Sequence, residues 1–176
     1  MRALLPLFLV LAAPAALAQA VLVDRLAAVV DAHPITRSAA DARATLLGAP
    51  PSGEARDKAR AEALTSLIDD WLIHLDAERR GLTVTPEEVE HALAEVAEQN
   101  HLTVSALLTE VTRHGFTSDG YRVELKRQLL EFKWLNTTAD RASRPSDPEA
   151  LMTFMASERV RLLAALRQQV AIEVKR

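Results

Sequence analysis

The sequence contains no cysteine and little glycine or aromatic residue, and each absence narrows what the protein can be. Without cysteine the chain forms no disulfides or thiolate metal sites, and it offers no cysteine nucleophile and no cysteine for attaching a lipid. Only 5 of the 176 residues are glycine and 4% are aromatic, whereas alanine and leucine dominate, which favours helices. With 49% hydrophobic and 26% charged residues the composition is globular, and its core alone has to hold the fold together.

Charge patches and catalytic motifs are also missing. The net charge is −3, the isoelectric point is about 6.0 and no basic stripe occurs, so no nucleic-acid partner is expected. No Gly-x-Ser-x-Gly, glycine-rich phosphate loop or His-Glu-x-x-His motif is present. Glu87, His91 and Glu95 could share a helix face as metal ligands, but further glutamates around them indicate a solvated acidic surface. We therefore expect no enzyme activity, no metal and no cofactor.

The long apolar run of the chain lies at its start. Arg2 precedes a run from Leu4 to Leu17, and residues 16–18 fit the small-x-small cleavage rule. The run is shorter than the ~20 residues that a membrane span needs. We therefore expect a signal peptide over residues 1–18 and an exported mature chain without an integral membrane segment.

Three helices with clear boundaries are predicted between residues 83 and 135. Thr85 and Pro86, followed by acidic residues, are typical of a helix start. The second helix is expected to begin after Thr103 and to end at Gly115, because glycine best accepts the left-handed conformation of a helix end. The third is expected to begin after Thr117. Helices this short need one another's apolar faces to be stable.

The flanking segments predict one long helix and the strands of a small sheet. Residues 24–36 indicate a strand, a turn and a second strand, and residues 170–175 alternate apolar and polar side chains as a strand does. Because a single strand must pair with another, we expect the two ends of the chain to meet in one sheet. Residues 54–80 predict the longest helix, whose apolar stripe includes Trp71 as a core residue.

The three central helices carry a resemblance to a known family. An acidic capped helix ends in Gln99-Asn100, a second helix ends at Gly115, and a long basic helix starts with Tyr121-Arg122. In their order and lengths these elements resemble the N-terminal chaperone module of the SurA-type periplasmic chaperones. The resemblance implies a mainly α fold: a helical SurA-N-like module with a small β-sheet formed by the N-terminal hairpin and the C-terminal strand.

The same resemblance divides the chain. Residues 24–135 are expected to form the chaperone module, residues 136–148 a polar, proline-containing linker, and residues 149–176 a helix and strand that complete the module. In the SurA-type chaperones, parvulin isomerase domains usually lie between the long basic helix and the final helix. The linker here is too short for a domain, so no isomerase domain is expected there.

The third central helix carries apolar residues on two faces, and the sequence leaves two interpretations open. The C-terminal helix covers the second face, or that face lines a groove that accepts an unfolded apolar segment. Methionines adapt to varied shapes and suit such a groove. The candidate client-binding residues are Phe116, Tyr121, Leu130, Trp134, Met152 and Met155.

The resemblance implies an ATP-independent periplasmic holdase. Its partners would be unfolded outer-membrane or secreted polypeptides, bound weakly and reversibly through their apolar and aromatic segments. The alternatives are a structural or assembly subunit of an envelope complex with one fixed partner and, with less support, a peptidyl-prolyl isomerase. The sequence is compatible with a monomer or with a dimer that swaps the C-terminal helix.

Overall fold

The computed structural model describes residues 24–175 of the chain. The predicted signal peptide over residues 1–18 lies outside this range. The elements within it are β1 (Leu26–Val30), β2 (His33–Thr36), α1 (Arg37–Leu46), α2 (Glu54–Arg79), α3 (Pro86–Gln99), α4 (Val104–Arg113), α5 (Ser118–Thr138), α6 (Pro148–Gln169) and β3 (Ile172–Val174). The mainly α fold with a small sheet is therefore confirmed.

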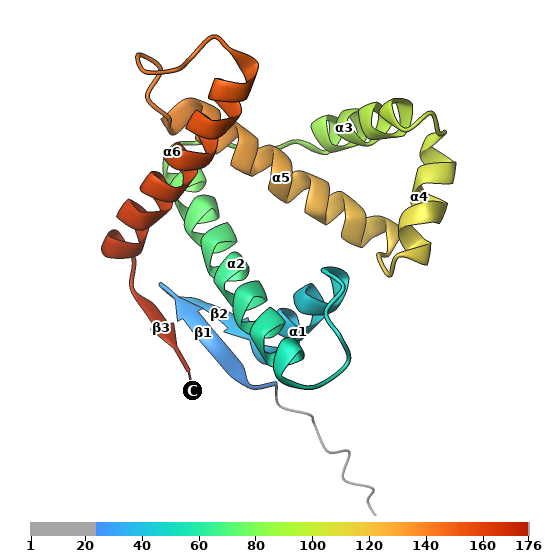
Figure 1. Ribbon diagram of the computed structural model, residues 1–176, viewed down its shortest axis with the longest axis vertical. Helices are drawn as coiled ribbons and strands as arrows, with labels where there is room; N and C mark the ends of the chain where they lie inside the picture. The colour runs from blue at the N-terminus through green and yellow to red at the C-terminus, as the bar shows by residue number, and fades with distance from the viewer. Residues whose placement is uncertain (1–23, 176) are drawn as a thin grey trace, which may run out of the picture.

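The sheet joins the two ends of the described chain (Figure 1). Its strand order is β2-β1-β3, and β1 pairs antiparallel with both neighbours. Val30 of β1 pairs with residues of both neighbouring strands: it lies opposite His33 of β2 on one side and Ile172 of β3 on the other. The prediction that the N-terminal hairpin and the C-terminal strand form one sheet is therefore confirmed.

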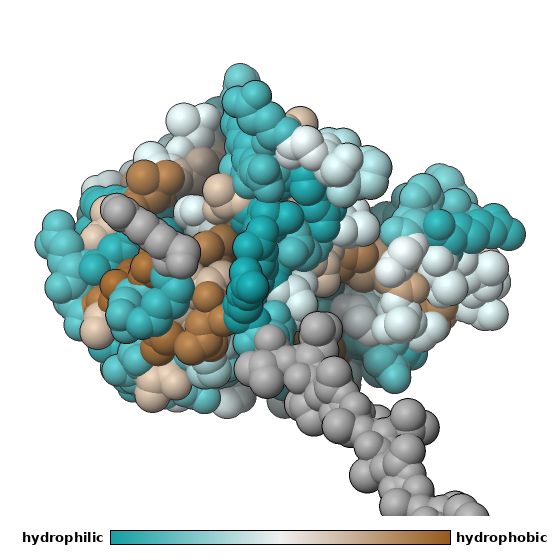
Figure 2. Space-filling view, turned by 90° about the horizontal axis from the view of Figure 1, so that it is seen from below, coloured by the Kyte–Doolittle hydropathy of each residue, from teal (hydrophilic) through white to brown (hydrophobic). Residues whose placement is uncertain are grey.

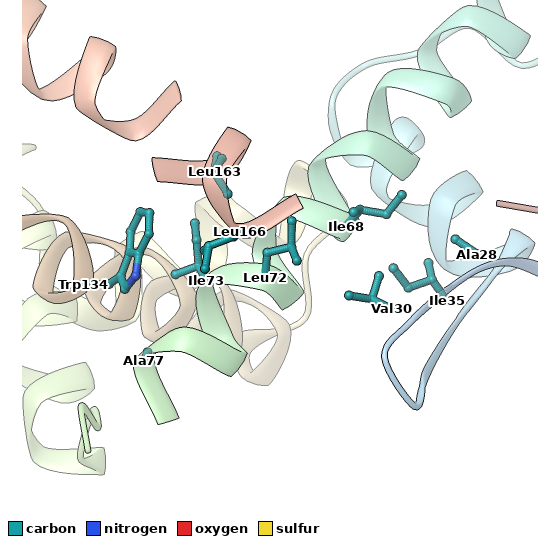
Figure 3. Packing of buried hydrophobic residues seen from close by; sticks show 10 residues of the cluster. All are labelled: Ala28, Val30, Ile35, Ile68, Leu72, Ile73, Ala77, Trp134, Leu163 and Leu166. Carbon is teal, nitrogen blue, oxygen red and sulfur yellow. The ribbon is translucent and has the colours of Figure 1, made fainter. Parts of the chain in front are cut away.

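The main core lies along α2, between the sheet and the two long helices α5 and α6 (Figure 3). Leu72 of α2, Val30 of β1 and Trp134 of α5 are each 0% exposed. Side chains of this kind contribute roughly 1.5–3 kcal/mol each when fully buried. The helix α2 thus connects the sheet on one side to α5 and α6 on the other.

A second core lies in a part of the molecule that projects from the first (Figure 1). It is formed by Val89 and Leu93 of α3, Leu107 of α4 and Leu125 of α5. We call α3, α4 and the N-terminal half of α5 the arm, and the remaining elements, with the C-terminal half of α5, the body. The helix α5 belongs to both parts and therefore sets how the arm stands on the body.

Local capping fixes the helix starts in the arm. The hydroxyl of Thr85 accepts from the backbone N–H of Glu88, and the Glu88 carboxylate accepts from the N–H of Thr85, a complete capping box. Thr103 and Thr117 cap α4 and α5 with the hydroxyl alone, which accepts from the backbone N–H of Ala106 and of Gly120, and Gly115 takes a φ of 90° after α4. The helix starts predicted at these positions are confirmed.

The connection between α5 and α6 is shorter than the expected linker over residues 136–148. The helix α5 continues through Thr138, and the backbone N–H of Ala139 closes it by donating to the Leu135 carbonyl at 2.9 Å. Asn136 and its neighbours are polar, but no proline breaks the helix there, so the connection consists of residues 139–147. Among the helices of residues 24–175, none has both the length and the hydropathy to cross a bilayer.

Candidate peptide-binding cleft

A cleft of about 640 Å³ lies where α1, α2 and α5 meet. Its apolar walls come from all three helices and from the turn before α5. They include Ala39, Ala42, Leu46, Leu67, Trp71, Phe116, Val123 and Leu130. Leu46 is 38% exposed and Val123 is 67% exposed, so the cleft presents apolar side chains to solvent. Figure 2 also shows apolar surface in the recess between the body and the arm.

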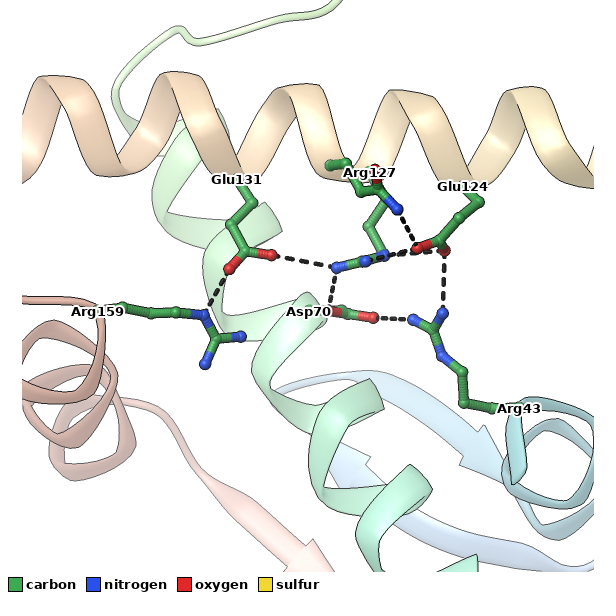
Figure 4. A network of polar contacts seen from close by, with 7 residues as sticks. Arg43, Asp70, Glu124, Arg127, Glu131 and Arg159 are labelled. Carbon is green, nitrogen blue, oxygen red and sulfur yellow. Dashed lines mark hydrogen bonds and ion pairs between the residues drawn. The ribbon is translucent and has the colours of Figure 1, made fainter. Parts of the chain in front are cut away.

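Most of the charged residues that also line the cleft are paired with one another (Figure 4). Arg43 of α1 donates to Asp70 of α2 and, at 2.9 Å, to Glu124 of α5. Arg127 of α5 donates to Asp70 at 2.9 Å, and it also donates to both carboxylate oxygens of Glu124, at 2.6 and 3.0 Å. Bidentate pairs of this kind are the strong ones. The network therefore connects the three helices that form the cleft.

The network continues along α5 toward α6. Glu131 accepts from Arg127 at 3.2 Å and also from Arg159 of α6. One face of α5 thus carries alternating charges: negative at Glu124, positive at Arg127 and negative at Glu131. They face positive, negative and positive groups from α1, α2 and α6, so the body and this face of α5 are complementary in charge.

Protonation of these carboxyls is strongly affected by their surroundings. Burial alone would raise the pKa of Glu124, but hydrogen bonds from Arg127 and Gln128 outweigh it and hold the pKa at about 2, below the ordinary 4.5. Burial raises the pKa of Asp70 in spite of the positive charges of Arg127 and Arg43. The pKa values of the two carboxyls are therefore shifted in opposite directions.

The lowered pKa of Glu124 predicts an acid-dependent loss of stability. A carboxyl with a lowered folded-state pKa contributes stability above its unfolded value of 4.5, and this contribution is lost as the pH falls toward about 2. We expect Glu124→Gln to be about 1–2 kcal/mol less stable than wild type at neutral pH, after allowing for solvent screening, and equally stable near pH 2. Urea unfolding across this range measures the difference. Glu62→Gln, at a 68% exposed side chain, should show no such convergence, and a constant difference for Glu124→Gln would contradict the assignment.

Trp71 lies in the cleft wall as well as against the core, which the sequence did not reveal. The ring of His33 stacks on its indole with centroids 3.4 Å apart, and His74 meets its edge at 4.8 Å. We predicted Trp71 to be a core residue because it lies on the apolar stripe of α2. In the structure its side chain is half-buried and packs against that core. The polar neighbours Asp70 and His74 were the signal that position 71 lies at the edge of the stripe.

Two of the predicted client-binding residues line the cleft. Phe116 and Leu130 both do so, from the turn before α5 and from α5 itself. Tyr121 meets Phe116 edge-on with centroids 6.0 Å apart, but it packs against the core of the arm. The structure thus brings Phe116 and Leu130 together with Trp71.

The assignment of Trp134 to a client-binding face is wrong for this structure. Its side chain lies within the main core (Figure 3) and is 0% exposed, and its indole N–H donates to Asp76 at 2.9 Å. The reason is that α2 and α6 cover this part of α5, with Leu163 and Leu166 of α6 in the same core. Of the two interpretations left open, coverage by the C-terminal helix therefore holds at Trp134, whereas Leu130, one turn earlier, reaches the cleft.

The methionines lie elsewhere. Met152 and Met155 are on α6, which Figure 1 places on the opposite side of α2 from α1, and neither lines the cleft. Met152 is 72% exposed. The structure therefore does not join these two residues to the others in one groove.

The chain resembles known proteins over most of its length. The family model of the SurA N-terminal domain matches residues 23–133. The chaperone SurA of Yersinia pestis is 28% identical over 157 residues, which cover 85% of this chain and 36% of that protein. The chaperone SurA of Sodalis glossinidius is 30% identical over 130 residues, covering 69% and 30%.

A solved structure gives the same picture for the fold. It comes from work on PEB4 and Cj1289, described as two structurally related SurA-like chaperones of Campylobacter jejuni. The TM-score is 0.50 at 21% identity, with 78% of this chain and 51% of that chain covered.

These matches identify the family. Because the family model covers more than half of the chain, the protein belongs to the SurA N-terminal domain family. The chain spans about a third of the length of the curated relatives that it matches. Between α5 and α6 the described chain has only residues 139–147, which is too short for a domain.

Proposed function

We propose that this protein is an ATP-independent periplasmic holdase that binds apolar and aromatic segments of unfolded outer-membrane or secreted polypeptides in the cleft between α1, α2 and α5. The observation that carries the proposal is an open cleft with apolar walls from three helices. Membership of the family and the similarity to chaperones named SurA support it. The predicted signal peptide supports a periplasmic location.

The chemistry of the cleft suits clients of varied sequence. The carboxylates and guanidiniums in it are already paired with one another, so the contacts left for a client come mainly from the apolar walls, together with the ammonium group of Lys126. Apolar attraction is non-directional and needs no particular order of side chains. This property allows one cleft to accept many unfolded segments.

The size of the cleft suits weak, reversible binding. A volume of about 640 Å³ lies in the ordinary range of ligand pockets and admits only a few side chains. Each buried apolar side chain contributes roughly 1.5–3 kcal/mol, from which the cost of ordering the client is subtracted. Release therefore needs no nucleotide.

The test changes the walls without touching the cores. Leu46 and Val123 line the cleft yet are exposed, so Leu46→Asp with Val123→Asp should leave the fold intact and place carboxylates where the client binds. We expect affinity for an unfolded β-barrel protein to fall by more than about tenfold, because burying an unpaired carboxylate is costly. Light scattering and fluorescence anisotropy of the labelled client measure the effect.

Val160→Asp is the matched control. The exposed fraction of Val160, 66%, is similar to that of Val123. Val160 lies on α6, however, and does not line the cleft. It should suppress aggregation as wild type does. Equal loss in the control and the double variant would rule out this cleft as the binding site. A wild-type protein that leaves aggregation unchanged would refute the holdase and favour a subunit with one fixed partner.

A further inference from the structure

Trp71 is the one cleft residue held by two imidazoles. His33 comes from β2 and stacks on the indole at 3.4 Å with the planes 28° apart, whereas His74 comes from α2 and meets the ring edge at 88°. Trp71 and His74 line the cleft, and His33 does not. Beside the core contacts between the sheet and α2, the hairpin thus touches a cleft residue through one ring that can gain a proton near neutral pH.

Protonation of His33 is opposed by its surroundings. A charged imidazole on an indole face gains a cation–π attraction. Against this, burial lowers the pKa of His33, and the nearby His74 lowers it further. The stacked position therefore favours the neutral imidazole of His33. Protonation makes the stacked arrangement less stable.

Among the other charged groups around the stack and the cleft beside it, Lys126 of α5 has no ion pair within residues 24–175, and the following groups are already engaged. On α2, Glu78 lies 3.3 Å from Nε2 of His74 on the side of the next helical turn, and Asp70 binds Arg43 and Arg127. From α5, Glu131 binds Arg127 and Arg159. Of these groups, only His74 acts appreciably on the charge of His33.

We propose that His33 is a positioning residue that holds Trp71 in the cleft wall at neutral pH and releases it on protonation, so that client binding weakens in mildly acidic surroundings. The inference rests on the proposed function and adds a regulation to it. The sign follows from the stack: the folded state with His33 in place binds fewer protons than the unfolded chain, so the arrangement is lost as the pH falls below about 6.5.

The first measurement needs no client. Nuclear magnetic resonance on the full mature chain follows the imidazole of His33 and the indole of Trp71 from about pH 8 to pH 5. We expect both to change with one midpoint, which lies below the ordinary value of 6.5. Trp71 signals that ignore the titration of His33, or a midpoint at or above the ordinary value, would overturn the proposal whatever the client does.

The second measurement is client affinity at about pH 7.5 and about pH 5.5. We expect a two- to tenfold loss in acid, the range that an aromatic pair contact supports. His33→Gln should bind at the weaker level at both pH values, and His33→Phe, which stacks but does not titrate, at the stronger level at both. His91→Gln, at a 76% exposed side chain, should keep the wild-type pH dependence.

The outcomes separate this proposal from the proposed function. No client binding by wild type at either pH refutes the holdase, while the resonance measurement still decides whether His33 positions Trp71. Client binding whose pH dependence survives in His33→Phe and His33→Gln refutes the regulation and leaves the holdase standing.

Discussion

Replacing Trp134 with alanine should lower the free energy of unfolding by about 3–5 kcal/mol, the usual cost of removing a large buried aromatic side chain. Trp134 is 0% exposed and packs in the core shared by α2, α5 and α6. The substitution also removes the indole donor to the buried Asp76. Since a whole domain is stable by only about 5–15 kcal/mol, much of the protein's stability depends on this residue. Equilibrium urea unfolding measures the loss.

Two variants separate the causes. Trp134→Phe keeps most of the ring but loses the hydrogen bond to Asp76, and should cost about 1–2 kcal/mol. Phe132→Ala, on the same helix but 66% exposed, should change stability by less than about 0.5 kcal/mol. A stable Trp134→Ala protein with weakened client binding would instead restore Trp134 as a client-binding residue.

Replacing Asp70 with alanine should also be strongly destabilising, by about 3–5 kcal/mol, the range for breaking a buried ion pair from one side. The Asp70 side chain is 11% exposed and accepts from Arg43 and Arg127, which come from different helices. Its removal leaves two guanidiniums facing each other with Glu124 as their shared partner. Because these contacts join α1 to α5, the loss should also loosen the cleft.

The control is another aspartate of α2. Asp57 is 70% exposed and pairs only with Arg60, so Asp57→Ala should change stability by less than about 1 kcal/mol. A double-mutant cycle of Asp70→Ala with Arg127→Ala should give a coupling of about 0.5–3 kcal/mol. Additive effects in that cycle would show that the network does not act as a unit.

Sequence reasoning succeeded where the determining contacts are local. Thr85 with Glu88, Thr103 and Thr117 fix helix starts through bonds within three residues, and such patterns can be read directly. The pairing of the two chain ends also followed, because each strand needs a partner. The order of the elements could therefore be predicted before their packing was known.

Sequence reasoning failed where the burial of a side chain depends on an element that is distant in the sequence. Trp134 was assigned to the client surface and is buried, and Trp71, which packs against the core as expected, also reaches the cleft. Both lie on apolar stripes, and which one meets solvent depends on where α6 packs. The ion pairs from Asp70 to Arg43 and Arg127 were equally hidden, because they join α1, α2 and α5.

The central strand of the sheet has a consequence for the order of assembly. As the chain emerges with its N-terminus first, β1 appears early and its partner β2 follows within a few residues, but β3 arrives only after all six helices of the described range. Until then one edge of β1 remains an open template for any other extended chain. Closing the contact between Val30 and Ile172 spans nearly the whole described chain and is entropically slow. A nascent copy is thus itself in need of protection until its last strand is in place.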